Sequence, residues 1–313
     1  MSNCPLCHSK KTEVFTKQIR FDLDATIYKC TECTLTYLDQ QSYNFSENFY
    51  ETEYHQTYLT HIDPDILDPQ IHYNKMIKAS SFWIEKIKSL LTRNDNVLDV
   101  GCSTGHLLSS IRNSANNIAG SELNHKEIDF CKNVLSLDVS SKPLDERFEE
   151  KYFDVITLNF VLEHIGEPIS FLKNLKRFLK DDGKIIIVVP NIHDPLLSLY
   201  NIDEFKKFYF CIEHLFYYSE KTLNDVMRKA GFKTEIECIQ EYPISNHLNW
   251  IYNQKPSETL NARKISPHIN IKEDNKQDLE KWENLWIDIN SKYNAHLKNN
   301  GFTDRLWCIG KNE

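Results

Sequence analysis

Glycine and long apolar runs are both scarce in this sequence. The chain has eight glycines in 313 residues, well below the usual share of about 7%. Its longest strongly apolar run, Ile185 to Val189, ends at Pro190, so it is far shorter than the roughly 20 residues of a membrane-spanning helix. The first residues contain neither a basic region nor an apolar core, which argues against a secretory signal. We therefore expect a cytoplasmic protein with no membrane span.

The chain also has fewer basic than acidic residues. Lys and Arg total 37 and Asp and Glu total 45, which gives a formal net charge of −8. This balance disfavours a protein that binds the phosphate backbone of a nucleic acid. Hydrophobic residues make up 41% of the chain and charged residues 26%, as in ordinary globular domains. We expect a folded protein with a small-molecule partner and no nucleic-acid partner.

Cysteine is concentrated at the N-terminus. Four of the nine cysteines form two C-x-x-C pairs, Cys4 with Cys7 and Cys30 with Cys33. Each pair places two thiolates on one side of a turn, and two such turns supply the four sulfurs of a tetrahedral zinc site. A segment this short cannot bury enough core to fold alone, so the metal would contribute folding energy. We predict a structural Zn²⁺ ribbon over residues 1–40.

Two alternatives to this ribbon follow from the same residues. The four cysteines can be unrelated to one another. The run from Cys4 to His8 also matches the C-x-x-C-H pattern of c-type haem attachment, but that attachment needs export. Residues 1–40 contain five basic and five acidic residues, and this neutrality weakens a role in RNA binding.

Residues 41–94 are interpreted as a connector and helical lid. Residues 41–70 have no Lys or Arg and contain six aromatic residues, so they form either a wall of a substrate site or a packed connector. From about Ile71 to Leu91 apolar residues recur at helical spacing. The aromatic residues are Tyr43, Phe45, Phe49, Tyr50, Tyr54 and Tyr58.

A strand, a tight turn and a helix are predicted between Asn96 and Leu108. The apolar strand runs into Gly101 and Gly105, and glycines there let the backbone approach a ligand at the N-terminus of the following helix. A second short strand ends at Glu122. A carboxylate at that position is placed to accept hydrogen bonds from two ribose hydroxyls.

The turn admits two interpretations besides the one we favour. Dinucleotide binding requires G-x-G-x-x-G, but Ser103 stands at the middle glycine and His106 at the last. The residues from Gly101 to Gly105 also match the G-x-S-x-G elbow of α/β-hydrolases. That elbow normally follows several strands and an oxyanion loop, which residues 41–96 do not supply.

The third interpretation is a family resemblance. Residues 97–105, with Asp99 at the strand end and Glu122 after the next strand, resemble the S-adenosylmethionine (SAM) site of class I methyltransferases. The resemblance continues in order through residues 153–165, 168–179, 184–191 and 219–231. It implies an α/β fold with a Rossmann-like seven-stranded sheet and helices on both faces. The core would span residues 95–240, followed by a helical insert or cap at 241–303 and a last strand at 304–313.

The resemblance also implies a set of cofactor contacts. The turn backbone and the acid before it would face the methionine part of SAM, and the acid after the second strand would hold the ribose. Apolar side chains would flank the adenine, and the residue after the fourth strand would lie at the sulfonium end. The predicted residues are Asp99, Gly101, Cys102, Ser103, Gly105, Glu122, Leu123, Leu144 and Asn159.

The acceptor and the base are expected in the C-terminal half. Residues 212–219 resemble a segment of deoxysugar C-methyltransferases in which a Glu-His pair lies at the active site. The tyrosine of that family is replaced by Cys211 here, which argues against the same C-methylation. A histidine with a pKa near 6.5 suits deprotonation of a hydroxyl acceptor, so His214 with Glu213 is the predicted catalytic pair. The alternative is a histidine in a structural corner.

The insert resembles a segment of methyltransferases from surface-polysaccharide pathways at residues 243–250. Asn246 and His247 are therefore predicted substrate contacts, together with Tyr217. A helix in the insert carries an apolar stripe that includes Trp282 and Leu285, and we expect this stripe to pack in the core.

These observations predict a SAM-dependent methyltransferase that methylates an oxygen of a sugar, sugar nucleotide or sugar phosphate in surface-glycan biosynthesis. One alternative is an RNA methyltransferase with a zinc ribbon. Another is a non-catalytic subunit that keeps the SAM fold and uses the ribbon to dock a partner.

Overall fold

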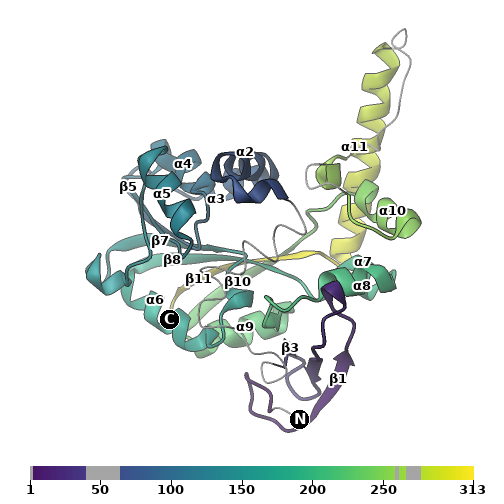
Figure 1. Cartoon of the computed structure of the whole chain (residues 1–313), viewed down its shortest axis with the longest axis horizontal. Helices are drawn as coiled ribbons and strands as arrows, with labels where there is room; N and C mark the ends of the chain where they lie inside the picture. The colour runs from purple at the N-terminus through teal and green to yellow at the C-terminus, as the bar shows by residue number, and fades with distance from the viewer. Residues whose placement is uncertain (1–2, 40–63, 258–260, 266–275) are drawn as a thin grey trace. The chain divides into compact units, whose positions relative to one another are not determined.

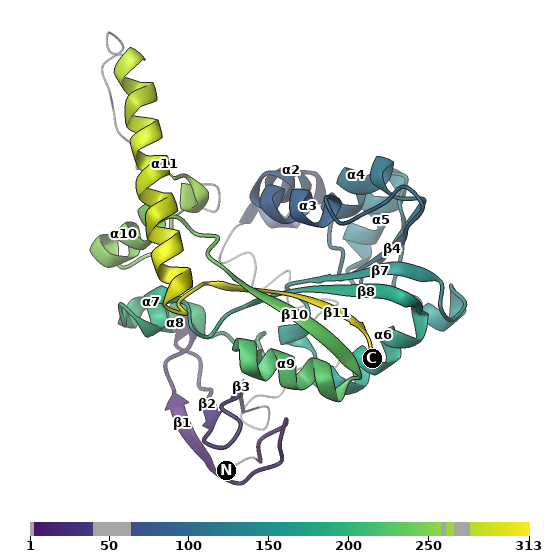
Figure 2. The same cartoon turned by 180° about the vertical axis from the view of Figure 1, so that it is seen from behind.

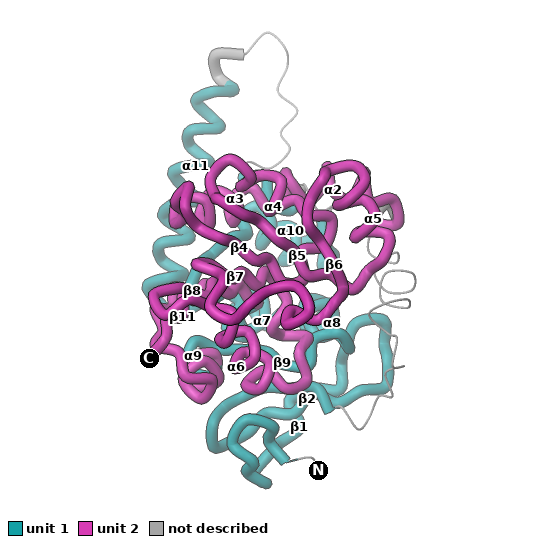
Figure 3. The backbone as a smooth tube through the Cα atoms, turned by 90° about the vertical axis from the view of Figure 1, so that its left-hand side faces the viewer, with its two compact units in different colours: residues 1–42, 190–222, 237–306 teal, residues 43–189, 223–236, 307–313 magenta. Residues whose placement is uncertain are grey.

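The computed structural model describes residues 3–39, 64–257, 261–265 and 276–313 (Figure 1). The chain divides into two compact units, shown in two colours in Figure 3. Unit 1 comprises residues 1–42, 190–222 and 237–306, and unit 2 comprises residues 43–189, 223–236 and 307–313. The ribbon therefore shares a unit with two segments far away in the sequence. The predicted aromatic wall at 41–70 lies largely outside the described residues.

Unit 2 is built on a seven-stranded sheet with the order β10-β11-β8-β7-β4-β5-β6. β4 pairs in parallel with both β5 and β7, and β7 pairs in parallel with β8. The order of the strands reverses at β4, which is the point where open α/β sheets bind ligands. The predicted seven-stranded Rossmann-like fold is confirmed. The strands are β4 (Asn96–Val100), β5 (Asn117–Ser121), β6 (Asp138–Ser140), β7 (Phe153–Asn159), β8 (Leu179–Pro190), β10 (Phe232–Ile239) and β11 (Arg305–Asn312).

Helices cover both faces of this sheet. Figures 1 and 2 show α2 to α5 on one side of the central strands and α6 and α9 on the other. The central strands are therefore buried on both faces, and Leu98, Ile156 and Ile186 are fully inaccessible. The helices are α2 (Pro69–Ala79), α3 (Ser81–Lys88), α4 (His106–Ile111), α5 (His125–Asn133), α6 (Pro168–Phe178) and α9 (Glu220–Lys229), with short 3₁₀ turns η3 (Pro64–Leu67), η4 (Arg112–Ser114), η5 (Leu144–Glu146) and η6 (Leu162–His164).

Side-chain caps fix where two of these helices begin. Asp68 accepts hydrogen bonds from the backbone N–H groups of Gln70 and Ile71 at the start of α2. Asn124 does the same for Lys126 and Glu127 at the start of α5. Such caps satisfy backbone donors that have no partner within the helix. α5 consequently starts immediately after the β5 end that carries Glu122.

Unit 1 contains a second, four-stranded sheet with the order β1-β2-β3-β9. β1 (Thr12–Thr16), β2 (Ile27–Cys30) and β3 (Thr36–Leu38) form an antiparallel meander, with η1 (Arg20–Asp22) between the first two strands. β9 (Phe216–Tyr217) then adds to the edge, with Thr36 opposite Tyr217 and Tyr37 opposite Phe216. The predicted ribbon segment is thus continued by a strand from residues 190–222, close to the predicted catalytic pair in the sequence.

The remaining elements of unit 1 are helical: α7 (Pro195–Ser198), α8 (Asp203–Tyr209), α10 (Ile244–Asn253), η7 (Asn261–Arg263) and α11 (Lys276–Asn299). α10 is joined to α11 by a hydrogen bond from the backbone N–H of Ile244 to Asn290 Oδ1. The prediction that the apolar stripe of α11 packs in the core is wrong for two of its members. Trp282 is 49% exposed and Leu285 is 43% exposed, because burial is confined to the C-terminal part of the helix, at Asn290 and Leu297.

In the part of the chain that the structure describes, no helix combines the length and the apolar character needed to cross a bilayer.

Candidate functional site

The turn between β4 and α4 has a left-handed backbone at three positions. Gly101, Ser103 and Gly105 have φ values of 68°, 48° and 71°. A Cβ atom on Gly101 would lie 2.6 Å from Val161 Cγ2, and one on Gly105 would lie 2.6 Å from Leu137 Cδ1. Glycine is therefore favoured at both positions for two reasons: the backbone is left-handed, and there is no room for a Cβ atom. Ser103 adopts the same conformation with a side chain, which costs on the order of 1 to 3 kcal/mol.

Glu122 holds this turn through its carboxylate. Its Oε2 accepts a hydrogen bond from the Ser103 N–H at 2.8 Å, and its Oε1 accepts from the N–H groups of Leu123 and Asn124 at 2.7 and 2.9 Å. Burial and the nearby Glu127 carboxylate raise the pKa of Glu122, against the lowering effect of the three N–H donors. The carboxylate is thus fixed in orientation at the end of β5, where a ribose would meet it.

Asp99 and Asn159 lie at the ends of the two neighbouring strands, β4 and β7. Thr157 Oγ1 donates to Asp99 Oδ1 at 2.6 Å. Burial, reinforced by the charge of Glu122, raises the pKa of Asp99 to about 7 despite the hydrogen bonds from Thr157 and Asn159. Asn159 Oδ1 is buried and has no hydrogen-bond partner among the described residues. A buried acceptor without a partner is costly, so this atom is suited to a donor on a ligand.

The other predicted cofactor residues occupy three kinds of position. Leu123 is 48% exposed after β5, and Leu144 begins η5, so both present apolar surface. The Cys102 side chain is buried and leaves only its backbone at the turn. All nine predicted residues therefore belong to unit 2. They lie at the ends of β4, β5 and β7, in the turn between β4 and α4, and in η5. The residues fit SAM, and their individual roles remain predictions.

Two buried residues that support the turn, His72 and Glu127, are not among the predicted site residues. Glu127 Oε1 lies 2.9 Å from His72 Nδ1 and accepts from Ser103 Oγ at 3.2 Å. Glu127 stands three residues after the cap Asn124, where a capping-box glutamate normally reaches back to the cap N–H. Glu122 already takes the Asn124 N–H, which leaves Glu127 available for Ser103 and His72. The Asn124–Glu127 spacing was the signal in the sequence.

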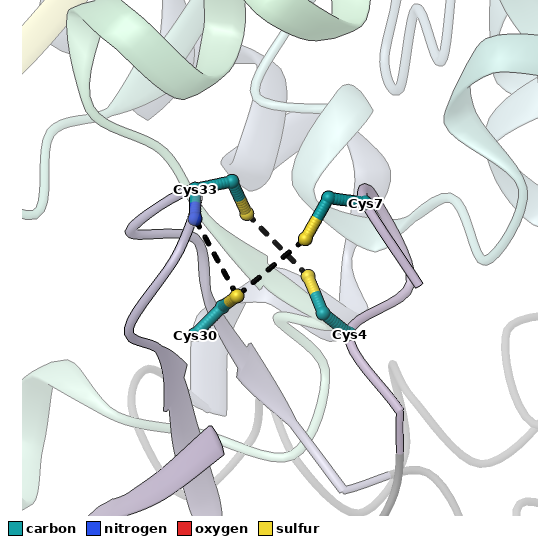
Figure 4. Close-up of side chains that lie close together, drawn as sticks. All are labelled: Cys4, Cys7, Cys30 and Cys33. Carbon is teal, nitrogen blue, oxygen red and sulfur yellow. Dashed lines mark hydrogen bonds between the residues drawn. The ribbon is translucent and has the colours of Figure 1, made fainter. Parts of the chain in front are cut away.

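The four N-terminal cysteines of unit 1 point toward one another (Figure 4). Sγ atoms lie 3.5 Å apart in the Cys4–Cys33 and Cys7–Cys30 pairs, and all four lie within 4.8 Å of one another. Tetrahedral zinc with Zn–S bonds of about 2.3 Å requires sulfurs roughly 3.8 Å apart. The predicted ligand set therefore fits a zinc ion.

The surroundings of the Cys30 thiol favour its ionised form. Burial opposes ionisation of Cys30, but the N–H groups of Cys33 and Glu32 and the Cys7 thiol outweigh it and lower the pKa of Cys30 to about 7. Burial raises the pKa of Cys4 to about 11. Since a metal ligand must be a thiolate, a bound cation is what would hold the buried sulfurs in their ionised form.

The predicted catalytic pair lies in a corner of unit 1 before β9. The Glu213 carboxylate is buried and forms an ion pair with Arg20 Nη1 at 3.4 Å. Burial raises the pKa of Glu213, and the Arg20 charge opposes this rise. His214 is half-buried, with its ring 5.8 Å from the Tyr217 ring.

The Tyr217 hydroxyl forms hydrogen bonds within the same loop. This group accepts from the Cys211 N–H and donates to the Cys211 carbonyl, both at 2.9 Å. Both hydrogen-bonding functions of the Tyr217 hydroxyl are thereby engaged within the loop. Cys211 itself is fully buried beside Tyr217 and Glu213.

Asn246 and His247, the predicted substrate contacts on α10, are both buried. The His247 ring contacts Gln240 Nε2 with one nitrogen and the Tyr293 hydroxyl with the other. Burial lowers the pKa of His247 to about 3, so the ring is neutral at physiological pH. Because Gln240 Nε2 can only donate, His247 Nε2 accepts and its Nδ1 donates to Tyr293.

Comparison with known proteins gives a family match. A model described as a methyltransferase domain matches residues 75–236, slightly more than half of the chain. A tRNA U34 carboxymethyltransferase from Nautilia profundicola is 26% identical over 175 residues, which cover 50% of this chain and 58% of that protein. A ubiquinone biosynthesis O-methyltransferase from Nitrosomonas europaea is 30% identical over 146 residues, which cover 43% and 61%. The chain thus spans less than two thirds of either relative.

A solved structure gives the same fold. A SAM dependent methyltransferase from Archaeoglobus fulgidus aligns with a TM-score of 0.50 at 16% identity, covering 82% of this chain and 100% of that chain. This likeness agrees with the Rossmann-like sheet order described above for this chain. The chain therefore belongs to the methyltransferase domain family and carries a class I, SAM-dependent methyltransferase domain.

Proposed function

We propose that this protein transfers the methyl group of SAM to an oxygen of a sugar, sugar nucleotide or sugar phosphate used in a surface glycan. The observation that carries methyl transfer is the arrangement of Asp99, Glu122 and Asn159 at the ends of three adjacent strands of unit 2. The sugar acceptor is supported by the resemblance of residues 212–219 and 243–250 to sugar and polysaccharide methyltransferases.

SAM, when bound, supplies a methyl group activated by a sulfonium. The chain must hold the cofactor and accept the acceptor's proton. Glu122 is suited to hold the ribose hydroxyls, because three backbone N–H groups already fix its carboxylate. Asn159 Oδ1 offers a buried acceptor to a donor on the cofactor.

The proposed base is His214. With SAM bound, the cofactor would supply the methyl group, and the His214 ring would accept the proton that the acceptor hydroxyl loses. Glu213 contributes by its ion pair with Arg20, which ties the 211–217 corner to the ribbon. Tyr217, Asn246 and His247 are proposed to shape the acceptor site from the buried positions described above, and a structural Zn²⁺ is proposed at the four cysteines.

The first test is cofactor binding measured by calorimetry with S-adenosylhomocysteine. We expect micromolar affinity for the purified chain and at least a tenfold loss in Glu122→Ala, since two charge-assisted hydrogen bonds are removed. Glu85→Ala, which removes an exposed acid on α3, is the matched control and should bind normally. Absence of binding by the unmodified chain would refute the proposal.

The second test compares acceptors with radiolabelled methyl groups. Sugar nucleotides and sugar phosphates should accept label, and His214→Ala should lower turnover about 10²-fold or more while leaving cofactor affinity unchanged. An RNA acceptor is the second candidate, favoured by the tRNA-modifying relative. Labelling of tRNA without labelling of sugars would replace our proposal with that one.

A further inference from the structure

A cavity in unit 1 has the composition of an anion site. It has a volume of about 330 Å³ and lies between the ribbon strands β1 and β2 and the segment that contains α7 and α8. Among the residues that the structure describes, its lining includes Phe15, Lys29, His193, Asn201 and Lys206, and no Asp or Glu. All of these residues belong to unit 1. The volume is at the lower end of the range for small-molecule sites.

Two lysines bring positive charge to this cavity from different segments. Lys29 Nζ lies 6.0 Å and Lys206 Nζ lies 5.7 Å from the centroid of the Phe15 ring. Within the described ranges neither ammonium forms an ion pair. Neighbouring cations of the same unit do: Lys11 pairs with Glu32, and Lys207 pairs with Glu204. No described carboxylate therefore pairs with the two lysines of the cavity, and the ring of Phe15 offsets their charge only in part.

The rim of the cavity carries groups that can donate hydrogen bonds. His193 and Asn201, both at exposed positions, each have a side-chain N–H, and the lining also includes the hydroxyl groups of Thr34, Thr36, Ser198 and Ser219. Partial burial and the charge of Lys29 lower the pKa of His193. A phosphate group has only acceptor oxygens and a charge near −2, so it would accept these hydrogen bonds and offset the charge of the two lysines.

We propose that this cavity binds the phosphate of a small metabolite, as a phosphomonoester or a diphosphate. Its size favours a small ligand over a polynucleotide, as do the neutral ribbon and the net charge of −8. This proposal goes beyond methyl transfer. It concerns a site in a different unit from the cofactor residues, and its occupancy is measurable without SAM.

The test is calorimetric titration of the full-length, metal-loaded chain with pyrophosphate, glucose 1-phosphate and glucose at constant ionic strength. We expect the two phosphate compounds to bind and glucose not to bind. Lys206→Gln should weaken pyrophosphate binding about tenfold or more. Lys207→Gln is the matched control, because it removes the neighbouring charge on α8 without touching the cavity, and we expect less than a twofold change.

Several outcomes would overturn the proposal. One is that neither phosphate compound binds at millimolar concentration. Another is that Lys206→Gln and Lys207→Gln change the affinity for pyrophosphate equally. Binding of a short RNA that depends on Lys206, with no binding of pyrophosphate, would assign the cavity to a polynucleotide instead. Equal zinc content and equal thermal unfolding of the two variants exclude misfolding as the cause. Failure here leaves the S-adenosylhomocysteine result untouched, so the two proposals fail separately.

Discussion

The turn after β4 and the N-terminal ribbon both fix a short irregular backbone, and they do so by different means. In the turn, left-handed glycines and the Glu122 carboxylate hold the chain with groups that the protein itself supplies. In the ribbon, four cysteine sulfurs face one another, and an external cation is needed to hold them as thiolates. The turn should therefore keep its backbone conformation when its ligand is absent, whereas the ribbon should lose its conformation when its cation is removed.

Metal removal gives the largest expected effect and tests this contrast directly. Structural zinc sites contribute on the order of 10 kcal/mol to folding. Chelation, or Cys33→Ser, should unfold the ribbon and disrupt the Arg20–Glu213 ion pair, and metal analysis of fresh protein should find one zinc per chain. Binding of S-adenosylhomocysteine depends on unit 2 and is the control. Metal-free protein with unchanged unfolding would contradict the ribbon hypothesis.

The pH dependence of stability should report the buried Asp99. Its pKa is about 7 in the folded protein against an ordinary value of 3.8, so the folded state binds more protons between these values. The free energy of unfolding should therefore fall as pH rises from about 4 to 7, by up to about 1.4 kcal/mol per unit.

Asp99→Asn isolates this contribution. Two other buried acids have raised pKa values, Asp194 at about 7 and Asp304 at about 6, and they give slopes of the same sign. Urea unfolding between pH 5 and 7.5 should therefore be less steeply pH-dependent in the variant than in the unmodified chain. If the free energy of unfolding depended on pH equally in the variant and in the unmodified chain, Asp99 would be ionised in the folded protein throughout this pH range.

A pair of glycine substitutions separates backbone strain from crowding. Gly101→Ala combines a left-handed backbone with a Cβ that meets Val161, while Gly301→Ala has a similar φ of 78° and nothing within 4 Å. We expect losses of about 3 kcal/mol and about 1 kcal/mol, respectively, in the free energy of unfolding. Equal losses would mean that Val161 moves aside at no cost.

Ser103→Gly should have the smallest effect. The substitution relieves the left-handed strain and removes the hydrogen bond to Glu127, and each of these contributes about 1 kcal/mol with opposite sign. Stability should consequently change by less than about 1 kcal/mol. Glu127→Ala removes the acceptor for Ser103 Oγ but leaves the left-handed serine in place, so it should lower the affinity for S-adenosylhomocysteine more than Ser103→Gly does.

Much of unit 2 was predictable because its signals are local. The apolar strand before Gly101, the acid after β5 and the helix caps each act within a few residues, and parallel strands of this kind have few possible orders. His72 escaped prediction because its partner Glu127 is 55 residues away. The exposed stripe of α11 was mispredicted because periodicity identifies an apolar face but not what covers it.

The sequence by itself determined the strand–turn–helix elements, the seven-stranded fold and the four cysteines, since these depend on local conformation and on residue types with few alternative uses. Only the tertiary structure decided that β9 joins the ribbon sheet, that Arg20 pairs with Glu213, 193 residues away, and that Lys29 and Lys206 share a cavity. Such contacts depend on how distant segments pack, and no local pattern of residues encodes that packing.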